Sequence, residues 1–129
     1  MSKTVKQILD FVDEIKPNAF SNDKKVDWLN RIENLVQIEI FLDAEEDLVT
    51  YTWTSDQNTQ VLVEPPYDGL YEQFLAAQID FAHGEYSQYQ ASMAAFNATW
   101  GAFSRYFARR FAPANGHRGD ERTWPITTS

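Results

Sequence analysis

The sequence predicts a mainly α-helical protein with one β-hairpin, and the spacing of its apolar residues supports both parts of this prediction. Four stretches repeat apolar residues at three- and four-residue steps, as amphipathic helices do. Between the second and third, over residues 48–63, the spacing changes to two, as in a β-strand. A length of 129 residues favours one bundle-like domain, residues 1–111, and the composition of residues 112–129 indicates an extended C-terminal arm.

The first predicted helix begins after Thr4 and ends near Lys16. Thr4 and Gln7 form a capping-box pattern, and Pro17 disfavours helical geometry at the residue before it. The apolar stripe of this helix consists of Val5, Ile8, Leu9, Val12 and Ile15.

The second predicted helix begins at the N-cap Ser21 and runs to about Phe41. Its apolar face consists of Val26, Leu29, Ile32, Val36 and Ile40, widened by Trp28 and Leu35. Its charged residues are expected to point away from that face: Asp27, Arg31, Glu33 and Glu39. The acidic run at residues 43–47 is predicted to be a solvated loop.

The predicted hairpin spans residues 48–63. Val49, Tyr51 and Trp53 alternate with threonines, a composition that suits a pleated surface. Residues 55–58 supply turn chemistry, and residues 59–63 offer a return strand. Because an isolated hairpin is marginal in water, its apolar face is expected to pack on helices or to pair with a strand of another chain.

Two further helices are predicted, from about Tyr67 to Gly84 and from Tyr86 to Phe111, and the alternative to a break at Gly84 is a kink in one longer helix. The third helix is apolar over much of its circumference and is therefore expected to be buried. At about 1.5 Å per residue the fourth spans roughly 40 Å, so part of it should project or pack on a second subunit. Its aromatic seam consists of Tyr86, Tyr89, Met93, Phe96, Trp100, Phe103 and Phe107.

Charge is divided unequally along the chain, whose net charge is -8. Residues 1–85 hold 17 acidic and 6 basic side chains (-11), whereas residues 86–129 hold 2 and 5 (+3). Such polarity can orient a partner or a second copy. Arg105, Arg109 and Arg110 form a basic patch at the end of the last helix. Complementarity to the helix dipole explains them, and contact with phosphate groups is the alternative.

Residues that carry catalytic or metal chemistry are scarce. The chain has no cysteine, which excludes disulfides and thiolate sites. Asp80 and His83 have the spacing of half a di-metal site, but no second such pair exists. Serine-nucleophile and phosphate-loop motifs are absent. We therefore expect no enzymatic activity, cofactor or metal, and no signal peptide or membrane span.

The C-terminal arm contains a candidate partner-binding motif. Trp124, followed by Pro125 and Ile126 in a polar context, suits an aromatic anchor for a groove or strand edge, although a solitary exposed tryptophan is an equally good interpretation. Arg118 begins an Arg-Gly-Asp tripeptide, which composition alone explains as chance.

Residues 16–113 resemble small structural proteins of tailed phages and prophages, and their overall plan resembles the head-tail connector (adaptor) proteins. The resemblance is carried by packing residues and short motifs: Lys16, Pro17, Asn18, Ala19, Phe20, Trp28, Leu29, Glu33, Pro65, Pro66, Tyr67, Leu70, Tyr71, residues 76–80, Gly84, Glu85, Tyr86, Phe96 and Asn97.

The resemblance implies a neck subunit of the virion, made in the cytoplasm of a bacterial host. Copies would form a ring, dodecameric in such proteins, beneath the portal protein, with a terminal segment docked into the portal and a channel that passes DNA without sequence preference. One alternative is a small acidic inhibitor or immunity-type protein that binds a basic enzyme as a monomer. A metal-dependent enzyme on a helical bundle is the other.

Overall fold

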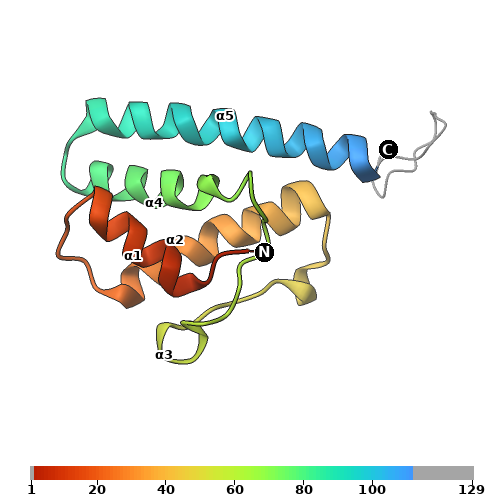
Figure 1. The fold of residues 1–129 in the computed structure, drawn as a ribbon, viewed down its shortest axis with the longest axis horizontal. Helices are drawn as coiled ribbons and strands as arrows, with labels where there is room; N and C mark the ends of the chain where they lie inside the picture. The colour runs from red at the N-terminus through yellow and green to blue at the C-terminus, as the bar shows by residue number, and fades with distance from the viewer. Residues whose placement is uncertain (1, 112–129) are drawn as a thin grey trace.

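A computed structural model describes residues 2–111, in which one helix, α4, packs against three others (Figure 1). The predicted mainly helical class is confirmed. The predicted arm, residues 112–129, lies outside the described residues. The elements are α1 (Val5–Ile15), α2 (Asn22–Leu35), the π-helical η1 (Val36–Phe41), the 3-10 helix η2 (Glu45–Asp47), α3 (Trp53–Asp56), α4 (Gly69–Ala82) and α5 (Tyr86–Phe111).

The first two helices begin where their capping residues predict. The Thr4 side chain accepts a hydrogen bond from the Gln7 backbone N–H (3.2 Å), and the Gln7 side chain accepts one from the Thr4 N–H (2.9 Å). Ser21 caps α2 through the Lys24 N–H (3.1 Å). η1 extends α2 to Phe41, the predicted end, and Leu42 leaves the helix with a left-handed φ of 60°.

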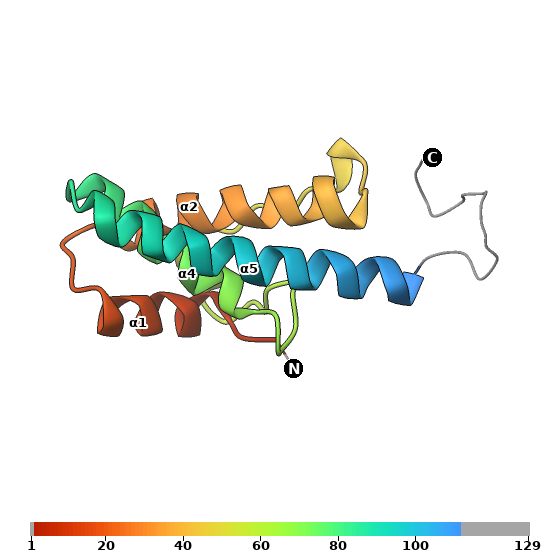
Figure 2. The same cartoon turned by 90° about the horizontal axis from the view of Figure 1, so that it is seen from above.

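The core is built around α4, whose side chains are buried on most of its circumference, as its apolar composition predicts. α1 and α2 pack on it. Figure 1 shows both on the side of α4 away from α5, and in Figure 2, seen from above, they lie to either side of the α4–α5 pair. The buried core residues include Val5, Ile8, Leu9, Val12, Leu29, Ile32, Leu70, Leu75 and Ile79. Not every predicted stripe residue is inside, because Ile15 and Leu35 at the stripe edges are exposed.

α4 and α5 form an αα-hairpin. Gly84, at a φ of 74°, supplies the left-handed conformation that the turn needs. On α5 only Phe96 and Phe103 are buried, at the centre of the predicted aromatic seam. Beyond the reach of α4, Phe103 packs on Tyr67 and Phe107 on Phe41, with ring centroids 5.4 and 4.9 Å apart.

The predicted hairpin at residues 48–63 is wrong. Within the described residues, none of this stretch belongs to a β-ladder beyond an isolated bridge between Thr4 and Gln60. Residues 48–52 are irregular, and residues 53–56 form the short helix α3. The two-residue spacing of apolar side chains therefore reflects side chains that alternate between buried and exposed positions, and not a pair of strands.

Side-chain amides of α2 and η1 replace the missing strand. Asn30 accepts from the Tyr51 N–H (2.7 Å) and donates to the Tyr51 carbonyl (2.9 Å). Asn34 donates to the Val49 carbonyl, and Gln37 accepts from the Val49 N–H, each at 2.9 Å. Since these amides satisfy the backbone groups that a ladder would pair, a second strand is unnecessary.

Candidate docking groove

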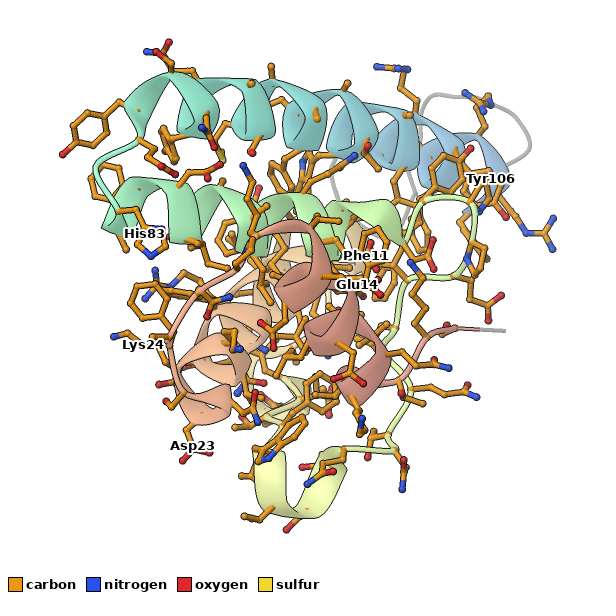
Figure 3. All side chains as sticks on the ribbon, turned by 60° about the vertical axis from the view of Figure 1, so that its left-hand side comes forward. Phe11, Glu14, Asp23, Lys24, His83 and Tyr106 are labelled. Carbon is orange, nitrogen blue, oxygen red and sulfur yellow. The ribbon has the colours of Figure 1, made fainter. Side chains whose placement is uncertain are left out.

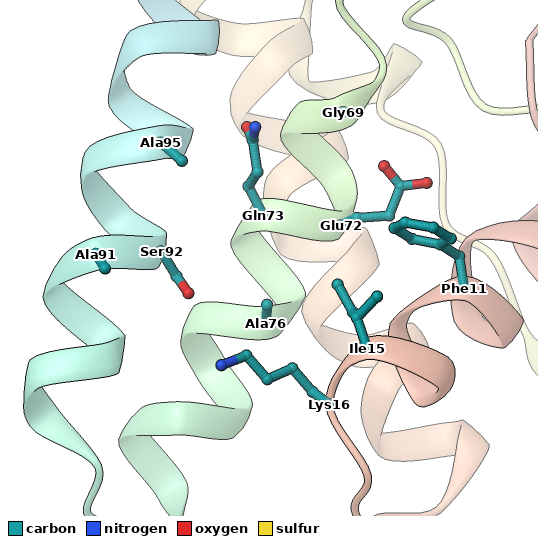
Figure 4. A pocket seen from close by; sticks show the side chains of 10 residues that line it. All are labelled: Phe11, Ile15, Lys16, Gly69, Glu72, Gln73, Ala76, Ala91, Ser92 and Ala95. Atoms are coloured by element: carbon teal, nitrogen blue, oxygen red, sulfur yellow. The ribbon is translucent and has the colours of Figure 1, made fainter.

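A groove of about 460 Å³ runs between α1 and α5, with α4 as its floor (Figure 4). Figure 4 shows Phe11 and Ile15 on α1 facing the small side chains of α5 across Ala76. The lining residues are Phe11, Ile15, Lys16, Gly69, Glu72, Gln73, Ala76, Ala91, Ser92 and Ala95.

The α1 wall of the groove is apolar and uncovered. Phe11 is 46% exposed and Ile15 is 47% exposed, although large apolar side chains are usually placed inside a domain. Opposite them, Ala91 and Ala95 leave the α5 backbone accessible to close approach. Phe11 lies outside the stripe that defines α1, and an aromatic residue off the stripe is the sequence signal that indicates this wall.

A polar contact pins the three helices together at one end of the groove. Lys16 Nζ on α1 lies 3.0 Å from Oδ1 of Asp80 on α4, which is fully buried. Ser92 Oγ on α5 donates to Asp80 Oδ2 (2.9 Å). Lys16 Nζ directs its hydrogen bond to Gln88 Oε1 (2.9 Å), so its contact with Asp80 is an ion pair without hydrogen-bond geometry.

This contact does not amount to a serine nucleophile. A serine needs a neighbouring base with a vacant lone pair to take its proton. Asp80 is the one carboxylate that contacts Ser92 in the described residues, and its charge is balanced by the Lys16 ammonium. The arrangement therefore holds the helices in place.

A second ion pair borders the groove near the chain start. Lys3 Nζ lies 2.6 Å from Glu72 Oε2 and 3.7 Å from Asp68 Oδ2, and it lies 5.7 Å from the Phe11 ring centroid. Burial alone would lower the pKa of Lys3, but the hydrogen bond and charge of Glu72, helped by Asp68, raise it overall. Lys16 in the groove and Lys3 at its border thus both face carboxylates.

Glu33 contradicts the sequence prediction. It was expected to point away from the apolar face of the second helix and is instead fully buried. Its Oε1 accepts from the Tyr71 hydroxyl (2.5 Å), and its Oε2 accepts from the Tyr51 hydroxyl (2.7 Å) and the Leu62 N–H (2.9 Å). Position 33 follows Leu29 by four residues and precedes Val36 by three, which is the spacing that could have placed it inside.

The pKa values of this network follow from its burial. Burial raises the pKa of Glu33, and the three hydrogen bonds oppose that rise without cancelling it. Burial also raises the pKa of Tyr51 and of Tyr71, and the nearby Glu33 charge raises both further. The hydrogen bonds of this network link α2, α4 and the segment between them. Because the network is closed to solvent, it offers no binding surface.

An aromatic cleft of about 450 Å³ lies at the far end of α5. Tyr67 packs on Tyr106 (5.1 Å) and Phe107 on Phe111 (4.4 Å, centroid to centroid). Arg110 and Glu64 also line it. Most of these rings pack on one another, so much of the aromatic surface of the cleft is already in contact within the chain.

The predicted partner-binding residues that the structure describes lie in two different environments. Tyr51 is buried, and Val49 and Trp53 pack partly buried against the core, so the hairpin edge that suggested them is missing. Arg105, Arg109 and Arg110 are exposed near the end of α5. Arg118, Trp124, Pro125 and Ile126 lie outside the described residues.

Metal ligands do not converge in the described part of the chain. No group of three or more His, Asp or Glu side chains there could hold a metal ion. His83 stacks on Phe20 with ring centroids 5.5 Å apart (labelled in Figure 3), while Asp80 faces Lys16 and Ser92. The two members of the candidate half-site therefore have other contacts.

Neither a protein-family model, nor a curated protein, nor a solved structure matches this chain. Over residues 2–111, none of the helices has the length and apolar character needed to cross a lipid bilayer.

Proposed function

We propose that this chain is a non-catalytic assembly subunit, and specifically a neck protein of the head-tail connector type in a tailed phage. The observation that carries the proposal is that large apolar side chains remain exposed on separate elements. They are Phe11 and Ile15 on α1, Leu35, Ile38 and Leu42 along α2, η1 and its cap, Phe81 on α4, and Tyr86 and Phe111 on α5.

Separate apolar surfaces favour assembly over a single binary contact. Exposed apolar patches commonly mark interaction sites, and in the view from above α1 and α2 lie to either side of the α4–α5 pair (Figure 2). A subunit with different surfaces on different sides suits heterologous contacts, which close into rings when the rotation between copies allows it. This supports a ring-forming subunit.

The phage assignment is supported by the resemblance of residues 16–113 to tailed-phage structural proteins. The charge division agrees with it, because an acidic lumen would repel DNA and let it slide. In this proposal the C-terminal arm, with Trp124, Pro125 and Ile126, meets the portal protein.

The test is reconstitution of the full chain with the portal protein of the same genome. We expect a complex larger than the portal alone by native mass measurement. Deleting residues 112–129 should abolish attachment and leave the far-UV circular dichroism per residue of the helical domain unchanged. A full chain that never joins the portal refutes the neck assignment, and a truncated chain that still joins it refutes the role of the arm.

The acidic-inhibitor alternative is favoured by the charge of -11 on residues 1–85 (17 acidic, 6 basic). It predicts a monomer at every concentration in sedimentation velocity, with tight, salt-sensitive binding to a basic enzyme. Concentration-dependent oligomers would dispose of it.

A further inference from the structure

We propose that the groove between α1 and α5 receives the end of α5 from a second copy of this chain. The α5 tip is defined here as Arg105, Arg109, Arg110 and Phe111. This inference rests on the proposed assembly role and deepens it by naming the two surfaces that meet.

The α5 tip combines an exposed aromatic ring with positive charge. Phe111 is 50% exposed, and the Arg110 guanidinium lies 5.8 Å from its ring centroid. Arg109 and Arg110 are exposed, and neither forms an ion pair within residues 2–111. Aromatic and arginine side chains together are the residue types that dominate protein interfaces.

The groove has room for the aromatic ring of this tip. Its volume of about 460 Å³ lies within the range of about 300–1,000 Å³ for sites that enclose a compact group. Phe11 and Ile15 can cover an aromatic ring, and Ala91 and Ala95 admit close approach of a helix.

The unpaired charge beside the groove is negative. Glu14 follows Phe11 by three residues on α1, is exposed, and forms no ion pair within the described residues (Figure 3). Lys16 in the groove is already paired with Asp80, and Lys3 at its border is paired with Glu72. A basic partner is therefore favoured over an acidic one.

The occupant must come from another copy because α5 is one continuous helix. Ala95 in the groove wall and Phe111 at the tip are 16 residues apart, which is roughly 24 Å along a helix at about 1.5 Å per residue. The tip cannot bend back to its own groove. Each copy therefore inserts its tip into the next, a head-to-tail contact of the kind that generates rings.

Cysteine cross-linking tests this contact directly, because the natural chain has no cysteine. Full-length Ile15→Cys and Phe111→Cys chains are mixed and oxidised, and each is also oxidised alone. We expect a cross-linked dimer in the mixture that is strongly reduced in each separate sample. The doubly substituted chain should give a ladder of multimers.

The matched control pairs Phe111→Cys with Ser55→Cys, an exposed position on α3 at the opposite side of the molecule from α5 (Figure 1). Equal dimer yield from the control pair and the groove pair overturns the proposal, since it would show random collision. No dimer from the groove pair at high protein concentration also overturns it.

Charge reversal provides the second test. Arg109→Glu with Arg110→Glu should lose the cross-link and the oligomers, and high salt should weaken both. Adding Glu14→Arg to the partner chain should restore part of the yield. A wild-type chain that stops at a dimer overturns head-to-tail insertion. Portal binding that survives charge reversal leaves the neck assignment intact, so the two proposals fail separately.

Discussion

The two helices of the αα-hairpin, α4 and α5, follow one another in the chain but are buried to very different degrees. Between Leu70 and Asp80 most side chains of α4 are buried. On the 26-residue α5 only Phe96 and Phe103 are buried. Figure 1 shows the cause, because α4 has helices on both sides whereas α5 lies on the outside of the molecule.

The difference indicates where function can reside. In a helix enclosed by others, close packing constrains nearly every side chain, so the sequence of that helix reflects the requirements of the fold. In a helix that buries only one seam, the remaining side chains are free of packing constraints and can serve contacts with other molecules. One wall of the groove and the tip both belong to α5. The following substitutions test whether α4 and α5 differ in their contribution to stability as their burial predicts.

The largest expected effect comes from a matched pair of tyrosines. Tyr71→Ala on α4 removes a fully buried ring and the hydroxyl that contacts Glu33 and the Val63 N–H. We expect a loss of about 3–5 kcal/mol in the free energy of unfolding. Tyr86→Ala on α5, where the ring is 58% exposed, should change it by less than about 0.5 kcal/mol. Urea unfolding measures both, and equal losses would contradict the comparison.

The buried part of the α5 seam, Phe96 and Phe103, should behave like α4. Phe96→Ala removes a buried ring that packs on Phe74, with centroids 5.6 Å apart, and should cost about 3 kcal/mol. Ala98→Ser, on the exposed side of the same helix, is the control and should lie within about 0.5 kcal/mol of the wild type. A loss under about 1 kcal/mol for Phe96→Ala would mean that α5 is not anchored by its seam.

The ion pair that joins the helices should have an intermediate effect. Lys16→Met leaves the buried Asp80 carboxylate without its cation, and since Lys16 is partly exposed we expect a loss of about 2 kcal/mol. Lys24→Met removes an exposed lysine of α2 that forms no ion pair within residues 2–111 and should be nearly neutral. Thermal unfolding of both variants makes the comparison; a neutral Lys16→Met would show that water compensates Asp80.

The smallest effect is a pH dependence at Glu33, the carboxylate against Tyr71 of α4. Because burial raises its pKa above the ordinary value of 4.5, the folded chain binds this proton more tightly than the unfolded chain. The stability it contributes is greatest below pH 4.5 and is lost as the pH rises through the raised value. The stability of the wild type minus that of Glu33→Gln should therefore fall with rising pH, and a flat or rising difference would contradict the assignment.

Local signals predicted the four long helices of the described region. The capping box at Thr4, the N-cap Ser21 and the Gly84 stop act within a few residues of themselves, so the sequence displays them directly. The aromatic seam of α5 was equally readable, because a helical period is a property of one segment.

Features that depend on contacts between distant residues could not be predicted from the sequence in this way. The alternation at Val49 and Tyr51 indicates an extended segment but does not say what pairs with it, and here the partners are Asn30, Asn34 and Gln37. The groove was not predicted for the same reason. Phe11 on α1 and Ala95 on α5 line one groove only once both helices have packed against α4.

The amide contacts of α2 have a consequence for self-association through the backbone. Residues 48–54 are rich in β-branched and aromatic side chains, the composition from which cross-β aggregates form when a bare edge is presented. Here Asn30, Asn34 and Gln37 already occupy the N–H and carbonyl groups of Val49 and Tyr51. The segment is thereby shielded from templating. Deamidation of Asn34, which would turn its donor into an acceptor, would free the Val49 carbonyl and so open one of these four contacts.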